Sequence, residues 1–390
     1  MSKALEKANI VEQAIGEYSS KPAEGSVPRY VVGKPNIFSP EIFLARVQEV
    51  MDSGWHTNDG PMVQRLEAFA AKSFGVSNCI AVANATLGLE LLLQALNLPA
   101  HSKVIVPSFT FVASVHAIVR AGLRPEFCDV DERGMIDCAH AESLIDSDTS
   151  AILAVNIYGF ACDVGRLESI AQRHRIQLLF DSAHGVGVKT STGSLGQHGS
   201  AEVFSLHATK IVSGFEGGLI TTNNASLASA LRLARNFGFS GYDQVSCVGT
   251  NAKLSEIHAA MALTNFEGLE SAISHNAKIF CVYEKELSPE VRLISPLASE
   301  SSNYQYVAVK CPAGLRDHIL DHLLKNGVFA RRYFYPGVHQ MDPYRACQVD
   351  LPRTNALCDS ILCLPTGPPV LAEDAVQIAA LFNAGLSISR

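Results

Sequence analysis

The sequence predicts an α/β protein in which helices sandwich a mostly parallel sheet, with a smaller α/β domain toward the C-terminus. Short apolar runs, such as 151–155 and 178–180, alternate with stretches of helical periodicity, which is typical of βαβ units. The chain has 390 residues, more than the roughly 100–200 of a usual domain. We therefore divide it into an N-terminal arm and linker (1–40), a large domain (41–268) and a small C-terminal domain (269–390).

Composition and charge exclude several functional classes. Hydrophobic residues make up 47% of the chain, enough for a sizeable core, and no apolar run is long enough to cross a bilayer. The net charge is −7 and no basic cluster occurs, so neither nucleic acid nor a membrane is an expected partner. The ten cysteines lack metal-ligand spacing, which indicates reduced thiols and no metal site. Because no signal peptide is recognisable, we expect a soluble, cytoplasmic protein.

Periodicity and turn residues predict the order of the elements. Apolar residues recur every four positions from Phe43 to Met51, in a helix that begins at Pro40 and ends at Gly54. Asp163 is expected to cap a later helix. The other expected elements are helices over 4–18, 63–74, 87–96, 226–236, 259–272 and 314–326, strands over 78–83, 103–106, 122–130, 150–155, 219–222 and 303–310, and a linker over 19–34.

Polar residues follow two of the apolar runs. One run ends at Asp181, which is soon followed by His184, and the other leads through Ser205 to Lys210. Ligands of α/β sheets bind at the carboxyl ends of the strands. We therefore expect these four side chains to line one crevice.

An acid and a lysine in one crevice fit pyridoxal phosphate (PLP) as the cofactor. A lysine amine can form a Schiff base with its aldehyde, and a carboxylate can keep its pyridine nitrogen protonated. Lys210 and Asp181 are the candidates for these roles. The alternative is a strand-end aspartate that caps a loop and a surface lysine, which would be the better interpretation for either residue alone.

These segments resemble the motifs of a known family. F-D-S-A-H-G at 180–185 is similar to D-x-A-H/Q-x-x-G of the DegT/DnrJ-type nucleotide-sugar aminotransferases, F-S-L-H-A-T-K at 204–210 to their F-S-F-H-x-T-K, and 215–218 to their E-G-G. The resemblance runs from about Trp55 to about Pro365, with the motifs in the family's order. It implies PLP as cofactor, bound in the large domain, and the fold type I of PLP-dependent transferases, which is aspartate-aminotransferase-like.

The resemblance also implies residues that hold the cofactor phosphate. N-A-T-L-G-L at 84–89 is similar to the family's S-G-T-x-A-L, and a small-residue turn at a helix N-terminus suits an anion. Thr86 would donate its hydroxyl and Leu87 its backbone N–H. Ala85 stands where the family has glycine, so a left-handed conformation there would be costly. The alternative is an ordinary N-capped helix.

Further cofactor contacts follow from the same resemblance. Phe111, in a segment similar to P-x-x-T-F/W-V-A-S/T, would stack on the pyridine ring, and His184 would hydrogen-bond the phenolic oxygen. Ser205 would bind the cofactor as well. Asn251, in a segment similar to G-x-N-x-K/R-M-x-E, would reach the cofactor phosphate of a neighbouring subunit, which implies a homodimer with shared active sites. The alternatives are a core aromatic at 111 and a turn asparagine at 251.

Arg331, Arg332 and Tyr333 resemble a family segment near the substrate mouth. Two arginines beside an aromatic residue suit a diphosphate, because each guanidinium group can pair with two oxygens. An exposed basic stretch is the alternative interpretation.

The resemblance implies that Lys210 is catalytic and moves a proton while an amino group passes from glutamate to a nucleotide-linked keto-deoxysugar. Phe215, where many relatives have glycine, favours C4 of a 4-keto-6-deoxy sugar, for surface polysaccharide or natural-product sugar biosynthesis. The alternatives are amination of another keto position, a non-catalytic PLP-binding regulator, and a dehydratase of the same fold. Lys210 disfavours the dehydratase, because such relatives have histidine in place of the lysine.

Overall fold

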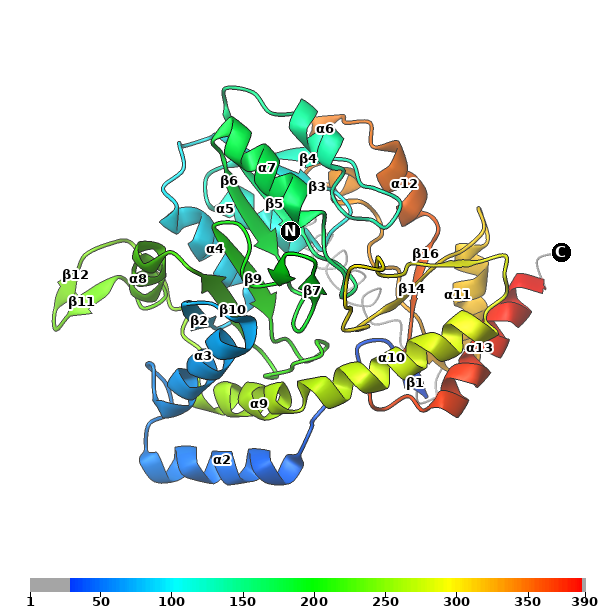
Figure 1. The fold of residues 1–390 in the computed structure, drawn as a ribbon, viewed down its shortest axis with the longest axis horizontal. Coiled ribbons are helices and arrows are strands. Elements are labelled where there is room, and N and C mark those ends of the chain that lie inside the picture. The colour runs from blue at the N-terminus through cyan, green and yellow to red at the C-terminus, as the bar shows by residue number, and fades with distance from the viewer. Residues whose placement is uncertain (1–28, 388–390) are drawn as a thin grey trace, which may run out of the picture.

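The computed structural model describes residues 29–387. The predicted helix over 4–18, and the predicted linker as far as residue 28, lie outside the described residues. Figure 1 shows a central sheet with helices on both sides and a second group of elements beside it. Two long helices, α9 (Glu256–Glu267) and α10 (Leu269–Glu286), connect the two groups. No helix within the described residues is long and apolar enough to span a membrane.

The central sheet has the strand order β2, β10, β9, β6, β5, β3 and β4. The strands are β2 (Asn78–Val82), β3 (Lys103–Pro107), β4 (Arg124–Cys128), β5 (Thr149–Val155), β6 (Gln177–Asp181), β9 (Ala201–Ser205) and β10 (Gly218–Thr222). Neighbours from β9 to β4 are parallel, and β10 runs antiparallel to both strands beside it. The predicted α/β fold with a mostly parallel sheet is therefore confirmed.

Buried strand residues point alternately to two apolar layers, as strand geometry requires. Leu179 packs in a layer with Leu89 and Leu231, whereas its neighbour Phe180 packs in a layer with Leu66. Helices α4 (Ala85–Ala95), α5 (Val112–Arg120) and α8 (Ala225–Ala234) contribute to the first layer, and α3 (Pro61–Phe74), α7 (Val164–His174) and α9 to the second. This region also contains α2 (Pro40–Ser53), α6 (Cys138–Ser143), and the short pairs β7–β8 (Lys189–Thr190, Gly193–Ser194) and β11–β12 (Phe239–Gly241, Gln244–Val245).

Two predicted helix ends are confirmed, and one predicted helix is wrong. Gly54 follows α2 with a φ of 64°, and Asp163 caps α7 by accepting a hydrogen bond from an N–H of its first turn at 3.1 Å. The helix predicted over 259–272 is two helices, α9 and α10, which are separated at Gly268. The ring of Phe38 packs on that glycine, where a Cβ would lie 2.1 Å from it.

Most of the C-terminal elements share an apolar core of their own, whereas buried residues of α12 and at the two 3-10 turns pack in the cores of the large sheet. The C-terminal elements are α10, β13 (Arg292–Leu293), β14 (Val307–Lys310), α11 (Arg316–Lys325), β15 (Val328–Phe329), α12 (Pro352–Cys358), β16 (Ile361–Leu364) and α13 (Ala372–Ser387), with 3-10 turns at Val338–Gln340 and Arg345–Cys347. Strands β13, β14 and β16 form an antiparallel sheet. Part of the predicted linker is a strand instead, because β1 (Tyr30–Val31) pairs with β15 and the Tyr30 hydroxyl donates to Asp374 at 2.6 Å.

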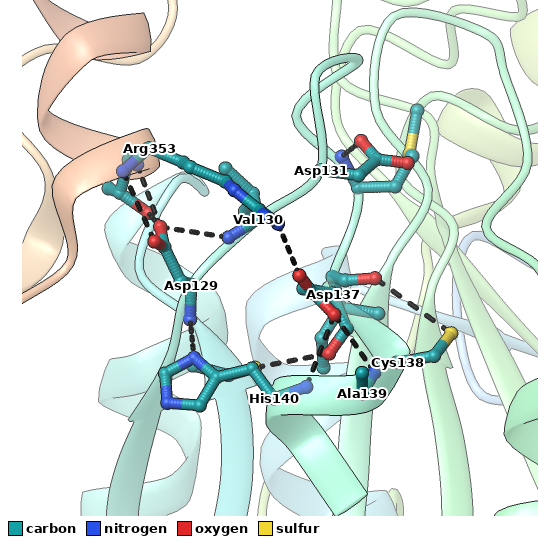
Figure 2. Close-up of polar contacts among 12 residues, drawn as sticks. Asp129, Val130, Asp131, Asp137, Cys138, Ala139, His140 and Arg353 are labelled. Carbon is teal, nitrogen blue, oxygen red and sulfur yellow. Dashed lines mark hydrogen bonds and ion pairs between the residues drawn. The ribbon is translucent and has the colours of Figure 1, made fainter.

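A buried carboxylate attaches α12 to the end of β4. Asp129 accepts hydrogen bonds from the backbone N–H groups of Arg353 and Thr354, at 3.1 and 2.7 Å, so its charge lies at the positive end of the helix. Figure 2 shows this contact beside His140, whose Nδ1 accepts from the Asp129 N–H at 3.0 Å, and the ion pair between Arg353 and Asp137. The attachment helps to hold the preceding segment, which carries the predicted substrate residues, against the large sheet.

Candidate active site

Asp181 is the last residue of β6, and its carboxylate is buried. The Ser114 hydroxyl donates to it at 2.6 Å and the backbone N–H of Ala183 at 3.1 Å. Burial raises the pKa of Asp181, whereas these two hydrogen bonds and the positive charge of Lys210 lower it. Two donors leave lone pairs of the carboxylate available for a further N–H partner, such as a protonated ring nitrogen.

Lys210 lies in the loop between β9 and β10. The backbone of this loop is fixed where the Ile211 N–H donates to the Gln305 side chain at 3.2 Å. Burial lowers the pKa of Lys210 to about 8, against the opposing influence of the Asp181 charge. A lysine with this pKa is partly neutral near physiological pH, as a nucleophile or a base must be. Its Nζ lies 5.8 Å from the centre of the Tyr306 ring, so an aromatic face forms one wall of the site.

His184 is buried beside the same aromatic wall, with its ring centre 4.8 Å from that of Tyr306. Its Nδ1 accepts the backbone N–H of Tyr158 at 3.1 Å. Burial, and secondarily the charge of Lys210, lower the pKa of His184 well below its usual value, so the ring is neutral. Because Nδ1 is an acceptor, the single ring proton is on Nε2, which can donate to an oxygen.

The predicted phosphate turn forms the start of α4. Ala85 is the first helical residue, so the strained left-handed conformation considered for it does not occur. The side chain of Asn84 caps the helix by accepting a hydrogen bond from the Leu87 N–H at 2.9 Å. The Leu87 N–H, which was predicted to bind the phosphate, therefore already has a partner within the protein. Thr86 lies in the same first turn. Gly218 packs directly against the turn, because a Cβ there would lie 2.8 Å from the Ala85 nitrogen.

The other predicted cofactor residues lie at element ends. Phe111 is the residue before α5 and is 58% exposed, so its ring face is open to a stacking partner. Ser205 ends β9, and its hydroxyl accepts the His207 N–H at 3.3 Å. Asn251 is exposed, and its side chain accepts a hydrogen bond from Lys253 at 2.7 Å.

The three predicted substrate residues differ in their surroundings. Tyr333 lies next to the site, with its ring centre 5.7 Å from that of Tyr306. Arg332 pairs with Asp317 of α11 at 3.4 Å, so its guanidinium group is engaged within the protein. The side chain of Arg331 is exposed.

Sequence reasoning missed Tyr306, Ser114 and Tyr158. Ser114 had a signal, because it is the last residue of the P-S-F-T-F-V-A-S segment that contains Phe111. Tyr158 had a signal as well, because it directly precedes a G-x-x-x-D segment at 159–163 that resembles a crevice-lining loop of the family. Tyr306 had none, since it reaches the site through packing of a segment far from Lys210 in the sequence.

Comparison with known families matches residues 39–383 to the DegT/DnrJ/EryC1/StrS aminotransferase family. This is most of the chain, and it includes every residue of the site described above. The chain belongs to this family. The expected family resemblance is thereby confirmed, and the protein is an aminotransferase that uses PLP.

Individual proteins that are similar to this chain support the same assignment. The chain is 31% identical over 344 residues to the dTDP-4-amino-4,6-dideoxy-D-glucose transaminase of Shigella dysenteriae, which covers 86% of this chain and 93% of that relative. It is 30% identical over 367 residues to the GDP-perosamine synthase of Caulobacter vibrioides, covering 92% and 98%. A crystal structure of DesI in the presence of its TDP-sugar product superposes with a TM-score of 0.88 at 35% identity, covering 93% of this chain and 95% of DesI.

The residues present fit the family cofactor on structural grounds. Asp181 keeps unused lone pairs in a buried position, Lys210 has a pKa lowered to about 8, and Phe111 offers an exposed ring face. The N-terminus of α4 provides a site where a phosphate is favoured by the helix dipole. These residues therefore match three groups of PLP: a carboxylate for the ring nitrogen, an amine for the aldehyde and a helix N-terminus for the phosphate.

Proposed function

We propose that the protein transfers an amino group from glutamate to C4 of a nucleotide-linked 4-keto-6-deoxy sugar. The observation that carries the proposal is the pairing of Asp181 and Lys210 in one buried site, with the lysine pKa lowered to about 8. One relative is named as a dTDP-4-amino-4,6-dideoxy-D-glucose transaminase and another as a GDP-perosamine synthase, and the DesI structure was determined in the presence of its TDP-sugar product, which supports a nucleotide sugar as the substrate. Surface polysaccharide or natural-product sugar biosynthesis in the cytoplasm is the proposed setting.

PLP, when bound, would supply an aldehyde that forms a Schiff base with an amine, and a ring that accepts the negative charge left at the donor carbon. Lys210 provides the amine for attachment, and once displaced it removes and returns the proton at the reacting carbons. Asp181 holds the proton of the ring nitrogen by charge pairing, and its own bonds to Ser114 and Ala183 keep it oriented. With PLP bound, the Nε2–H of His184 would donate a hydrogen bond to the phenolic oxygen, and Phe111 would cover one ring face and exclude water.

The roles of the remaining residues follow the same proposal. Thr86 and the first turn of α4 would bind the cofactor phosphate, and Ser205 would contact the cofactor. The backbone N–H of Leu87 is engaged by Asn84 and is not free for the phosphate. Arg331 is better placed than Arg332 for the substrate diphosphate, because the latter is paired with Asp317. Phe215 packs between Phe43 and His258, at ring-centre distances of 5.7 and 6.2 Å, so its link to C4 rests on family resemblance alone.

We also infer a homodimer in which Asn251 of one chain completes the phosphate site of the other. Exposed apolar residues support an interface between copies: Ile42, Leu44 and Met51 on α2, and Phe239, Tyr242 and Val245 on the β11–β12 hairpin. Figure 1 shows this hairpin extending away from the body of the chain. Burying such a patch against a second copy would remove it from water.

The proposed division at about residue 268 stays a prediction. The interruption between α9 and α10 and the separate core of the C-terminal elements support it. The strand Tyr30–Val31 packs with the small domain although it belongs to the proposed arm over residues 1–40.

The test of the function is a pair of measurements on the purified protein. Incubation with glutamate should abolish the visible absorption of the bound cofactor, and a panel of nucleotide keto-sugars should yield one product whose mass shows exchange of oxygen for an amino group. Lys210→Ala should lose covalent attachment of PLP and turnover. Retention of both in this variant would overturn the proposal.

A further inference from the structure

The carboxylate of Glu202 lies in β9, fully buried at 0% exposure, and has no role in the chemistry described above. Three donors surround it: the Ser182 hydroxyl at 2.5 Å, and the backbone N–H groups of Gly196 at 2.5 Å and His198 at 3.0 Å. A buried carboxylate is costly unless its oxygens are hydrogen-bonded. These donors provide that compensation and at the same time tie together the segments to which they belong.

The two oxygens of Glu202 hold two different turns. Oε1 accepts both backbone N–H groups of the turn that precedes β9, and Oε2 accepts the hydroxyl of Ser182 in the turn that follows β6. The turns also pack on each other, because a Cβ at Gly185 would lie 2.8 Å from Leu195 Cδ1. Glu202 therefore connects the turn after β6 and the turn before β9 to strand β9.

Ser182 lies in the sequence between Asp181 and His184, the two residues of that turn that we propose contact the cofactor. Asn156 donates through Nδ2 to the Ser182 oxygen at 2.9 Å, and through its backbone N–H to the Asp181 carbonyl at the same distance. Since Asn156 is a donor to Ser182, the hydroxyl proton of Ser182 is directed to Glu202. This arrangement needs an unprotonated oxygen on Glu202.

We propose that Glu202 is a positioning residue that acts through Ser182 to fix the turn presenting Asp181 and His184 to the cofactor. The inference rests on the function proposed above for those two residues. Burial raises the pKa of Glu202 to about 7, and its hydrogen bonds to Ser182 and the two N–H groups oppose this rise. The three hydrogen-bond donors that Glu202 holds in place thus also favour the negative charge of its carboxylate.

The direct test is Glu202→Gln, which keeps the shape of the side chain but places an NH2 group against a donor. We expect the dissociation constant of PLP to rise roughly tenfold and kcat to fall by a similar factor, with little change in KM for the sugar. Ser182→Ala should produce the same losses. Because both residues act in one chain of contacts, the double variant should be no worse than either single one.

Glu168→Gln is the matched control. Glu168 contacts the same turn from the outside, accepting the Gly199 N–H at 3.3 Å and lying 3.4 Å from His198 Nδ1, but it makes no contact with Ser182. We expect cofactor affinity and kcat of this variant to equal those of the unmodified protein. The Glu168 charge raises the pKa of Glu202, so its removal leaves Glu202 unprotonated, whereas a general effect of removing charge near the turn would appear here as well.

A second readout does not depend on the loaded enzyme. In the apoprotein, the ring nitrogen resonances of His184 should shift in Glu202→Gln and in Ser182→Ala, and stay in place in Glu168→Gln. Wild-type PLP affinity and kcat in Glu202→Gln would overturn the proposal, as would additive losses in the double variant. If Glu202→Gln does not fold, unchanged cofactor binding and histidine resonances in Ser182→Ala would overturn it. A failure of the proposed function is seen separately, as covalent PLP attachment in Lys210→Ala.

Discussion

The Ser114 hydroxyl donates a 2.6 Å hydrogen bond to the carboxylate of Asp181, across the gap between α5 and the end of β6. Ser114 also shares a 2.9 Å hydrogen bond with the hydroxyl of Thr110. Phe111 lies between these two hydroxyl residues in the sequence. The start of α5 therefore positions the ring of Phe111 and orients the carboxylate of Asp181, the two groups that we propose contact the cofactor ring.

Ser114→Ala should weaken catalysis most strongly at low pH. The hydrogen bond from Ser114 lowers the pKa of Asp181, so its loss raises that pKa and the carboxylate is protonated at a higher pH. We expect the acidic limb of the kcat/KM profile to move to higher pH, with activity recovering above the raised pKa. Thr110→Val is the control, because Thr110 contacts Ser114 and not Asp181. An acidic limb that stays in place in Ser114→Ala would contradict the role assigned to this bond.

The amine of Lys210 should titrate in the apoprotein well below an ordinary lysine. Burial lowers its pKa to about 8, so the neutral amine forms above that pH, and the rate of reaction with added PLP should rise with pH and level off beyond it. Stopped-flow absorbance measures this rate.

Tyr306→Ala should move this midpoint to higher pH, because burial is the main cause of the lowered pKa and the tyrosine ring provides part of it. Tyr306→Phe keeps the ring and is the matched control, with an unchanged midpoint. Equal midpoints in the alanine and phenylalanine variants would show that the ring does not control the lysine.

Gly218→Ala should destabilise the protein and weaken PLP binding. The added Cβ would lie 2.8 Å from the backbone of Asn84 and Ala85, so the start of α4 must shift. Overpacking of this kind costs about 1–3 kcal/mol of unfolding free energy. Calorimetry and cofactor titration measure the two effects. Gly165→Ala is the control, because a Cβ there meets no atom within 4 Å and the residue lies inside α7.

Two inactive variants should restore activity when they are mixed. In the proposed dimer, Lys210 and Asn251 of one site come from different chains, so a hybrid of Lys210→Ala with Asn251→Ala contains one intact site. Random exchange of subunits should return about a quarter of the full activity. Light scattering of each variant verifies the dimer, and mass spectrometry verifies the exchange. Confirmed hybrids without activity would exclude a shared site of this composition.

The errors in the predicted elements share one cause. The helix over 259–272 was expected to continue, but it is interrupted at Gly268, where Phe38 from a distant segment packs. The segment 19–34 was interpreted as a linker whose packing the sequence does not decide, and the structure pairs Tyr30 and Val31 with β15. Local periodicity contains no information about a partner far away in the sequence, so neither feature was predictable.

By itself, the sequence determined which strands end in reactive side chains. Buried apolar runs that stop at Asp181 and Ser205 are local patterns, and the motifs around Lys210 identify the family. The tertiary structure alone decided how these groups behave. The lowered pKa of Lys210, the neutral state of His184 and the bond from Ser114 to Asp181 all arise from burial and contacts between distant segments. Protonation depends on the solvent and charges that surround a group, and these exist only once the chain has packed.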